Sequence, residues 1–203
     1  MEFLFIGLIG YLIGSLSPAA VLAKIKHVNL KEEGTKNLGA TNTALVLGRA
    51  FGIFVMLFDI MKSFCASRLA RWLFPALEYA DVTAGVACVL GHIFPVFMKF
   101  RGGKGLAAYI GMILALNWKF ALVIAVMVLL VTVITDYIVA GTTLTIVTVP
   151  VYLGIAEHSV LLALTLCIAT AVIVYKHRMN YVRIYKGTEI GLRSVMKGKH
   201  RMK

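Results

Sequence analysis

The sequence predicts an all-α, polytopic membrane protein, a helical bundle of about seven transmembrane helices. Three observations predict it. Sixty per cent of the 203 residues are apolar, long apolar runs follow one another along the chain, and the basic residues gather in alternate connections between the runs. Soluble domains contain about 45–50 % apolar residues, and a soluble chain of this length has too little interior to bury the excess. Lipid must therefore solvate much of the surface.

We predict one transmembrane helix for each apolar segment: residues 3–23, 50–67, 82–98, 105–118, 120–135, 137–156 and 158–175. The first is expected to be a retained span, because secretory signals start with a positive region and here Glu2 precedes the apolar run. Residues 105–135 are short for two spans of about 20 residues each. One long span is the alternative, but it would place Lys119 near mid-membrane, so a break at Trp118–Lys119 with two short spans is favoured.

The basic residues predict the orientation. Of 21 Lys and Arg, 17 lie in the segments 24–49, 99–104 and 176–203. Seven spans with the N-terminus outside place all three segments, and the C-terminus, on the cytoplasmic side, in agreement with the positive-inside rule. The net charge of +12 is also typical of nucleic-acid binders, but no nucleic-acid module is visible. We expect one membrane domain over residues 1–190 and a basic cytoplasmic tail over 191–203, disordered or bound at the membrane surface.

The three cysteines, Cys65, Cys88 and Cys167, all lie within apolar stretches. Their number is odd, and no CxxC or Cys/His spacing occurs. The sequence therefore indicates neither a disulfide framework nor a zinc site.

The first polar cluster is the run Gly34-Thr35-Lys36-Asn37-Leu38-Gly39-Ala40-Thr41-Asn42 in the first basic segment. Glycines permit positive φ, so successive backbone N–H groups can converge on an anion. Lys36 adds a charge. Hydrogen-bonding side chains come from Thr35, Asn37, Thr41 and Asn42. The alternative is a polar turn with Asn and Thr helix caps.

The second polar cluster contains Gly91-His92-Ile93-Phe94-Pro95-Val96-Phe97, followed by Phe100-Arg101-Gly102-Gly103-Lys104-Gly105. A helix that starts after Gly105 would direct its N-terminus at this loop and favour a bound phosphate. Arg101 and Lys104 supply full charges. The alternative is a cytoplasmic turn whose cations only set the topology. We expect His92 to be a structural, hydrogen-bonded histidine.

The third polar cluster follows the last span and contains His177, Asn180 and Arg183, then Gly187-Thr188-Glu189. The i, i+3 spacing places His177 and Asn180 on one helical face. The alternative is a solvated juxtamembrane face attracted to anionic lipid. Asp59 and Lys62 are also three residues apart, inside the second span, where a charge is costly unless it is paired.

In this order and topology, the motifs resemble the bacterial acyl-phosphate-dependent glycerol-3-phosphate acyltransferases over about residues 5–190. The resemblance rests on Gly14-Ser15-x-x-Pro18, Asn37-x-Gly39-Ala40-Thr41-Asn42, Leu47-Gly48, Asp59-x-x-Lys62, Gly91-His92-x-Phe94-Pro95-Val96-Phe97, Phe100-x-Gly102-Gly103-Lys104-Gly105, His177-x-x-Asn180-x-x-Arg183 and Gly187-x-Glu189. No single motif decides the matter, but the ordered set is specific.

The resemblance implies an acyltransferase of the bacterial inner membrane with its active site on the cytoplasmic face. It implies acyl phosphate and glycerol 3-phosphate as substrates and membrane lipid as surroundings, with no metal, cofactor, nucleic acid or required protein partner. Catalysis would involve Lys104, His177, Asn180 and Thr35. Substrate binding would involve Lys36, Asn37, Gly39, Ala40, Thr41, Asn42, Arg101, Gly102, Gly103, Gly105, Thr142, Arg183 and Glu189.

The chain also departs from the family pattern. Thr35-Lys36 stands where the family usually has Ser-Gly, and Leu45 stands where it usually has Arg. Near the sixth span, Asp136 and Val139 replace Arg and Ser, while Thr142 aligns with a further Ser. Losing a phosphate-facing Arg is not conservative, and Lys36 could replace its charge but not its bidentate geometry.

Three alternatives to an ordinary acyltransferase follow. A weakly active or redirected paralogue would explain the departures. A transporter or flippase for a phosphorylated solute or lipid would usually keep polar groups near the midplane and show repeats. Here only Asp59 and Lys62 lie deep, and no repeat is evident. A non-catalytic membrane scaffold is the third alternative.

Overall fold

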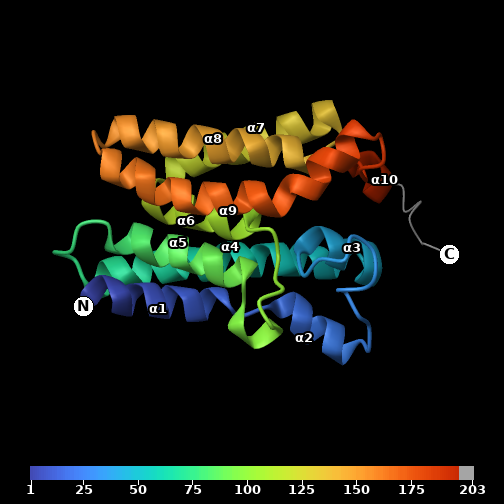
Figure 1. Cartoon of the computed structure of the whole chain (residues 1–203), viewed down its shortest axis with the longest axis horizontal. Helices are drawn as coiled ribbons and strands as arrows, with labels where there is room; N and C mark the ends of the chain where they lie inside the picture. Colours follow the sequence, from blue (N-terminus) through green and yellow to red (C-terminus); the bar gives the residue numbers. More distant parts are fainter. Residues whose placement is uncertain (197–203) are drawn as a thin grey trace. The chain divides into compact units, whose positions relative to one another are not determined.

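The computed structural model describes residues 1–196, and the secondary structure over this range is helical (Figure 1). Two compact units divide the chain: the first comprises Met1–Leu116, and the second begins at Asn117. Residues 197–203, part of the predicted basic tail, lie outside the described residues. The extent of the predicted membrane domain, 1–190, stays a prediction.

The helices of the first unit are α1 (Glu2–Gly14), α2 (Pro18–Ile25), α3 (Ala40–Leu47), α4 (Arg49–Leu73), α5 (Ala80–Ile93), the 3₁₀ turn η1 (Val96–Met98) and α6 (Leu106–Leu116). Helix α1 packs along α5, and α4 packs against α3, α5 and α6. Small residues allow the close approach of α1 and α5. A Cβ atom on Gly10 or Gly14 would collide with the backbone of Ala84 or Cys88.

The predicted continuous span 3–23 is wrong in one respect: α1 and α2 are separated by a break at Ser15–Ser17. Pro18 causes it, because proline has no N–H to continue the ladder and the residue before it is driven to extended backbone. Ser17 is extended (φ −124°, ψ 101°), and its side chain caps α2 by accepting from the N–H of Ala20. The N-terminal apolar stretch therefore consists of two helices with a short polar break between them.

The helices of the second unit are α7 (Trp118–Thr135), α8 (Ile138–Ala156), α9 (Val160–Tyr185) and α10 (Leu192–Met196). Helix α8 packs between α7 and α9. A Cβ on Gly141 of α8 would contact the backbone of Val128 on α7 more closely than side chains normally allow. Helix α9 continues ten residues beyond the predicted end of its span at 175, so His177, Asn180 and Arg183 of the third polar cluster lie on its last turns and Gly187-Thr188-Glu189 follow its end.

Six stretches of the described residues are long and apolar enough to cross a membrane: Glu2–Ile25, Arg49–Leu73, Ala80–Met98, Trp118–Thr135, Ile138–Ala156 and Val160–Tyr185. The lipid-facing character is clearest on α7, where Leu122, Val126 and Leu129 are exposed. The chain is therefore a multi-pass membrane protein.

The predicted break near Trp118–Lys119 is confirmed, and the alternative of one long span over 105–135 is wrong. Asn117 has extended backbone and accepts from the N–H of Phe120 at 2.9 Å, which starts α7 afresh. Helix α6, by contrast, has only 11 residues. An α-helix of that length rises about 16 Å, short of the hydrocarbon thickness of about 30 Å. The seventh crossing, and with it the parity of the termini, stays a prediction.

Candidate active site

The first basic connection is organised by Asn42, whose side chain is fully buried near the start of α3. Its amide nitrogen donates to the carbonyls of Leu30 (2.8 Å) and Glu33 (3.1 Å), and its Oδ1 accepts from the backbone N–H of Thr35 (2.5 Å). Gly34 passes beside the same side chain with φ +59°, where a Cβ would collide with Oδ1. Asn42, predicted to bind substrate, thus folds the loop that carries Thr35.

The other predicted residues of this loop lie around that brace. Thr35 and Asn37 are half-buried, whereas Lys36 and Thr41 are exposed. Gly39 is the N-cap residue of α3 and Ala40 its first residue. Lys36 adopts φ +56°, a left-handed conformation that favours glycine. This backbone gives a physical reason for the glycine that the family usually has at this position.

The glycine loop, residues 99–105, folds back onto the end of α5. The N–H groups of Gly102 and Gly103 donate to the carbonyls of Ile93 (3.2 Å) and His92 (3.1 Å). The N–H groups of Gly102 and Gly103 are thus already used within the chain, and the predicted substrate binding by these two residues stays a prediction. Glycine is needed at both positions because there is no room for a side chain. A Cβ on Gly102 would collide with the His92 carbonyl and Pro95, and a Cβ on Gly103 would collide with the His92 imidazole.

The predicted helix start after Gly105, close to the cations of the glycine loop, is present. Helix α6 starts at Leu106, immediately after Gly105 (φ +101°), and the N–H of Tyr109 donates to the Gly105 carbonyl. The first N–H groups of a helix lack intrahelical partners and favour anions. Lys104 is half-buried two residues before this helix start, and Arg101 is exposed in the same loop. A helix N-terminus preceded by two positively charged residues can hold a phosphate.

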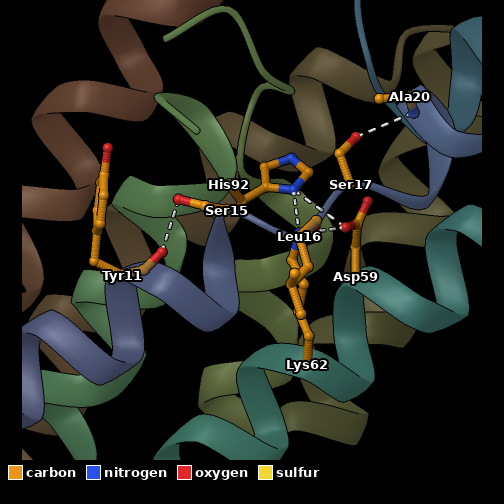
Figure 2. Close-up of polar contacts among 8 residues, drawn as sticks. All are labelled: Tyr11, Ser15, Leu16, Ser17, Ala20, Asp59, Lys62 and His92. Atoms are coloured by element: carbon orange, nitrogen blue, oxygen red, sulfur yellow. Dashed lines mark hydrogen bonds and ion pairs between the residues drawn. The ribbon is translucent and has the colours of Figure 1, made fainter. Parts of the chain in front are cut away.

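A buried ionic cluster of Asp59, Lys62 and His92, drawn in Figure 2, contacts the glycine loop through the His92 ring beside Gly103. Lys62 and Asp59 form an ion pair of 2.7 Å with both side chains only 3 % exposed. Nδ1 of His92 lies 3.2 Å from Oδ1 of Asp59 and 3.1 Å from Nζ of Lys62. The expectation that His92 is a hydrogen-bonded structural histidine is confirmed: Nδ1 donates to Asp59 or accepts from Lys62, according to its tautomer.

The third polar cluster is tied together by Glu189. Its two carboxylate oxygens accept from Nδ2 of Asn180 and from Nε of Arg183, each at 2.6 Å. The chain returns to meet them through a turn in which Gly187 has φ +66° and the Thr188 N–H donates to the Arg183 carbonyl. Both oxygens of Glu189, a predicted substrate ligand, are thus occupied by residues of its own unit.

His177 lies on the same face of α9 as Asn180, and both side chains are buried, as the i, i+3 spacing predicts. Its Nδ1 lies 2.9 Å from the carbonyl oxygen of Ile173. A carbonyl can only accept, so Nδ1 carries the proton in the neutral ring and Nε2 carries the lone pair. His177 can therefore accept a hydrogen bond or a proton at Nε2.

The positions that depart from the family pattern near the sixth span have structural roles. Asp136 holds the beginning of α10: its Oδ1 accepts from the N–H of Arg193 and its carbonyl from that of Leu192, both at 2.7 Å. Residues 192–196 thus form a helix attached at Asp136. The tail was expected to be disordered or bound at the membrane surface, and for these residues disorder is wrong while surface binding stays a prediction. Val139 and Thr142 are buried in α8, and the Thr142 hydroxyl donates to the carbonyl of Ile138.

Sequence reasoning missed several contacts. One is the Asn42 brace within the first basic segment. The other two join residues far apart in the chain: the attachment of α10 to Asp136, and a hydrogen bond from Nζ of Lys31 to the carbonyl of Met98 (3.1 Å). Only Asn42 carried a local signal, since Asn near a helix start commonly bonds nearby backbone. Lys31 and Asp136 had none.

Fold and site together define a polytopic helical membrane protein with cationic and amide-rich polar clusters suited to phosphate-bearing substrates. A family model described as glycerol-3-phosphate acyltransferase matches residues 4–187. The chain belongs to this family.

Relatives over nearly the whole length agree. The chain is 32 % identical over 189 residues to the glycerol-3-phosphate acyltransferase of Aquifex aeolicus, covering 93 % of this chain and 98 % of the relative. It is 33 % identical over 207 residues to glycerol-3-phosphate acyltransferase 1 of Oceanobacillus iheyensis, covering 96 % and 97 %. Both relatives are acyltransferases, so the family is one of enzymes.

Two crystal structures of PlsY (YgiH), an integral membrane glycerol 3-phosphate acyltransferase, match the fold. Its glycerol 3-phosphate form has a TM-score of 0.89 at 30 % identity and covers 97 % of this chain and 98 % of that one. Its lysophosphatidic acid form has a TM-score of 0.85 at 31 % identity and covers 97 % and 100 %.

Proposed function

We propose that this chain transfers a fatty acyl group from acyl phosphate to the 1-hydroxyl of glycerol 3-phosphate. The hydroxyl oxygen forms a bond to the acyl carbonyl carbon, the bond between that carbon and the phosphate oxygen breaks, and the products are lysophosphatidate and inorganic phosphate. The observation that carries the proposal is the family match over residues 4–187. The glycerol 3-phosphate and lysophosphatidic acid forms of the matching structure correspond to the acceptor and the product.

The polar groups of the chain suit such a reaction without the His-x4-Asp acid–base pair of other acyltransferases. Both substrates carry phosphate, and Lys104 with Arg101 at the start of α6 can neutralise one of them. The leaving phosphate can take the proton of the attacking hydroxyl. Catalysis then rests on holding the two substrates in contact and on charge neutralisation.

In the second unit, His177 and Asn180 supply positioning groups. Nε2 of His177 can accept from the glycerol hydroxyl, since Nδ1 is committed to the Ile173 carbonyl. Asn180 is oriented by Glu189. In the first unit, we propose that the hydroxyl of Thr35, in the loop braced by Asn42, orients a substrate.

We further propose that the enzyme resides in the bacterial inner membrane with these clusters on the cytoplasmic side. The support is the charge distribution: 17 of 21 Lys and Arg lie in the three segments that carry the clusters. Both substrates are soluble or amphiphilic phosphates of the cytoplasm, so a cytoplasmic site meets them directly.

The deciding experiment uses the purified protein in lipid vesicles with acyl phosphate and labelled glycerol 3-phosphate. Formation of labelled lysophosphatidate is expected, and Lys104→Ala should lower kcat/KM by more than tenfold, a factor worth about 1.4 kcal/mol. Lys119→Ala, at an exposed lysine of the opposite connection, is the matched control and should keep its rate. No product from the unsubstituted protein would overturn the proposal, and retention of more than a tenth of the rate in Lys104→Ala would assign Lys104 to topology.

A further inference from the structure

The Asp59–Lys62–His92 cluster is unusual in its setting, since it is buried within helices that cross the membrane. Burying two charges carries a desolvation penalty that their mutual attraction offsets only with good geometry and further hydrogen bonds, and apolar residues of similar size often serve stability as well. The Asp59 oxygen accepts from Lys62 and lies within hydrogen-bond distance of His92. The cluster thus joins α4 to the last turn of α5 at one oxygen atom.

On one side, the cluster holds the break between α1 and α2. Ala20, which would donate to the Leu16 carbonyl in a continuous helix, donates to Ser17 instead. Nζ of Lys62 takes up that carbonyl at 2.8 Å, as Figure 2 shows. The Lys62 ammonium therefore donates to a backbone carbonyl that has lost its helical donor at the break.

On the other side, the cluster meets the glycine loop through the His92 ring. The imidazole lies so close to Gly103 that a Cβ there would collide with Nε2, and the carbonyl of His92 accepts from the Gly103 N–H. The next turn is held from α1, because the hydroxyl of Tyr11 donates to the carbonyl of Phe94 at 2.7 Å. Gly103, the residue before Lys104, therefore packs directly against the His92 ring.

We propose that Asp59, Lys62 and His92 are positioning residues for the glycine loop. The ion pair fixes the imidazole, the imidazole fixes the backbone at Gly102–Gly103, and Lys104 is thereby placed at the start of α6. The inference rests on the proposed function, since the loop is taken to bind the phosphate of one of the two substrates. None of the three side chains is required to touch that substrate.

A double-substitution cycle between His92 and Gly103 tests the contact. Gly103→Ala alone should raise the KM of one phosphate substrate at least tenfold, because its Cβ displaces the loop from the ring. His92→Asn keeps an amide near Asp59 but removes the atoms beside Gly103, and so makes room for that Cβ. The double variant should be no worse than the worse single variant, whereas independent effects would multiply.

A second cycle tests the transmission from the ion pair. Asp59→Asn preserves shape and should raise the same KM about fivefold or more with kcat changed less than about twofold, and it should add nothing to His92→Asn. Ser63→Ala, at a buried serine one turn along α4, is the control and should leave KM unchanged. A merely structural role would lower the melting temperature and the amount of active enzyme at constant KM.

The outcomes separate the two claims. If the unsubstituted protein makes no lysophosphatidate, the proposed function fails. The quantity compared among the variants of both cycles is then the rise in melting temperature on addition of inorganic phosphate. If it makes lysophosphatidate but the effects of His92→Asn and Gly103→Ala multiply, the positioning role alone is refuted. Should Asp59→Asn not fold, the first cycle still decides.

Discussion

The Glu189 tether allows a quantitative test of how the second unit holds Asn180. Glu189→Ala removes the acceptor of two hydrogen bonds of 2.6 Å, from Asn180 and Arg183. A hydrogen bond to a charged group contributes about 1.5–3 kcal/mol. The Arg183 side chain is 36 % exposed, so solvent screening reduces its share to at most about 1 kcal/mol. The arrangement around Asn180 should lose about 2–4 kcal/mol in all.

If Asn180 must be held in this orientation during the reaction, that loss appears in the rate. We expect kcat/KM for lysophosphatidate formation to fall at least about 30-fold in Glu189→Ala, since each 1.4 kcal/mol is a factor of about ten. Glu189→Gln keeps one acceptor oxygen but no charge, so it should lie between Glu189→Ala and the unsubstituted protein. The assay uses acyl phosphate and labelled glycerol 3-phosphate with protein in lipid vesicles.

The control for this prediction is Glu157→Ala, which removes an exposed carboxylate at the end of α8 in the same unit and should leave the rate unchanged. Thermal unfolding in detergent shows whether each variant still melts cooperatively. A Glu189→Ala protein that melts cooperatively and keeps its rate within threefold of the control would refute the tether.

Three further predictions concern the first loop, the tail and the orientation. Lys36→Gly should raise the melting temperature, because a left-handed φ costs a non-glycine residue about 1 kcal/mol. Adding Leu45→Arg to Lys36→Gly should raise activity. Unchanged KM values for Lys36→Ala across salt concentrations would show that Lys36 does not replace the missing arginine. Asp136→Ala should speed hydrogen exchange at the amides of Leu192 and Arg193 about fivefold, equal to a loss of about 1 kcal/mol, with activity retained; unchanged exchange would contradict the attachment of α10. A C-terminal alkaline phosphatase fusion should be inactive, because the C-terminus is expected in the cytoplasm; an active fusion would contradict the seven-span parity.

The membrane class and most helix positions could be predicted from the sequence because lipid selects long apolar runs regardless of their partners. The break at Asn117 was predictable because Lys119 cannot rest at mid-membrane. The end of α9 was not, since polarity begins at Lys176 while the helix continues to Tyr185. A change in polarity marks the edge of the apolar medium, whereas the end of a helix is set by backbone hydrogen bonds and here by Gly187.

The α1–α2 break was predictable in principle from Ser17-Pro18, a helix cap followed by a residue without N–H. An apolar run on both sides concealed it. The consequence of the break, a carbonyl at Leu16 that recruits Lys62, depends on a residue 46 positions away. Local sequence patterns indicate where backbone groups lose their partners, but only the packing of the helices shows which side chain replaces them.

The polar clusters show the same division between residue type and task. Gly102, Gly103 and Asn42 were predicted to meet the substrate because glycine and asparagine occur in anion-binding loops, but both residue types also make tight backbone turns. The structure assigns these three to the second role: two glycines lie against His92, and the asparagine saturates its amide within the loop. In these clusters, a charged side chain is a better indicator of substrate binding than the presence of glycine or asparagine. Lys104 is a half-buried lysine just before a helix N-terminus that already favours anions, and it brings a full positive charge to the loop. Its replacement is therefore expected to weaken phosphate binding.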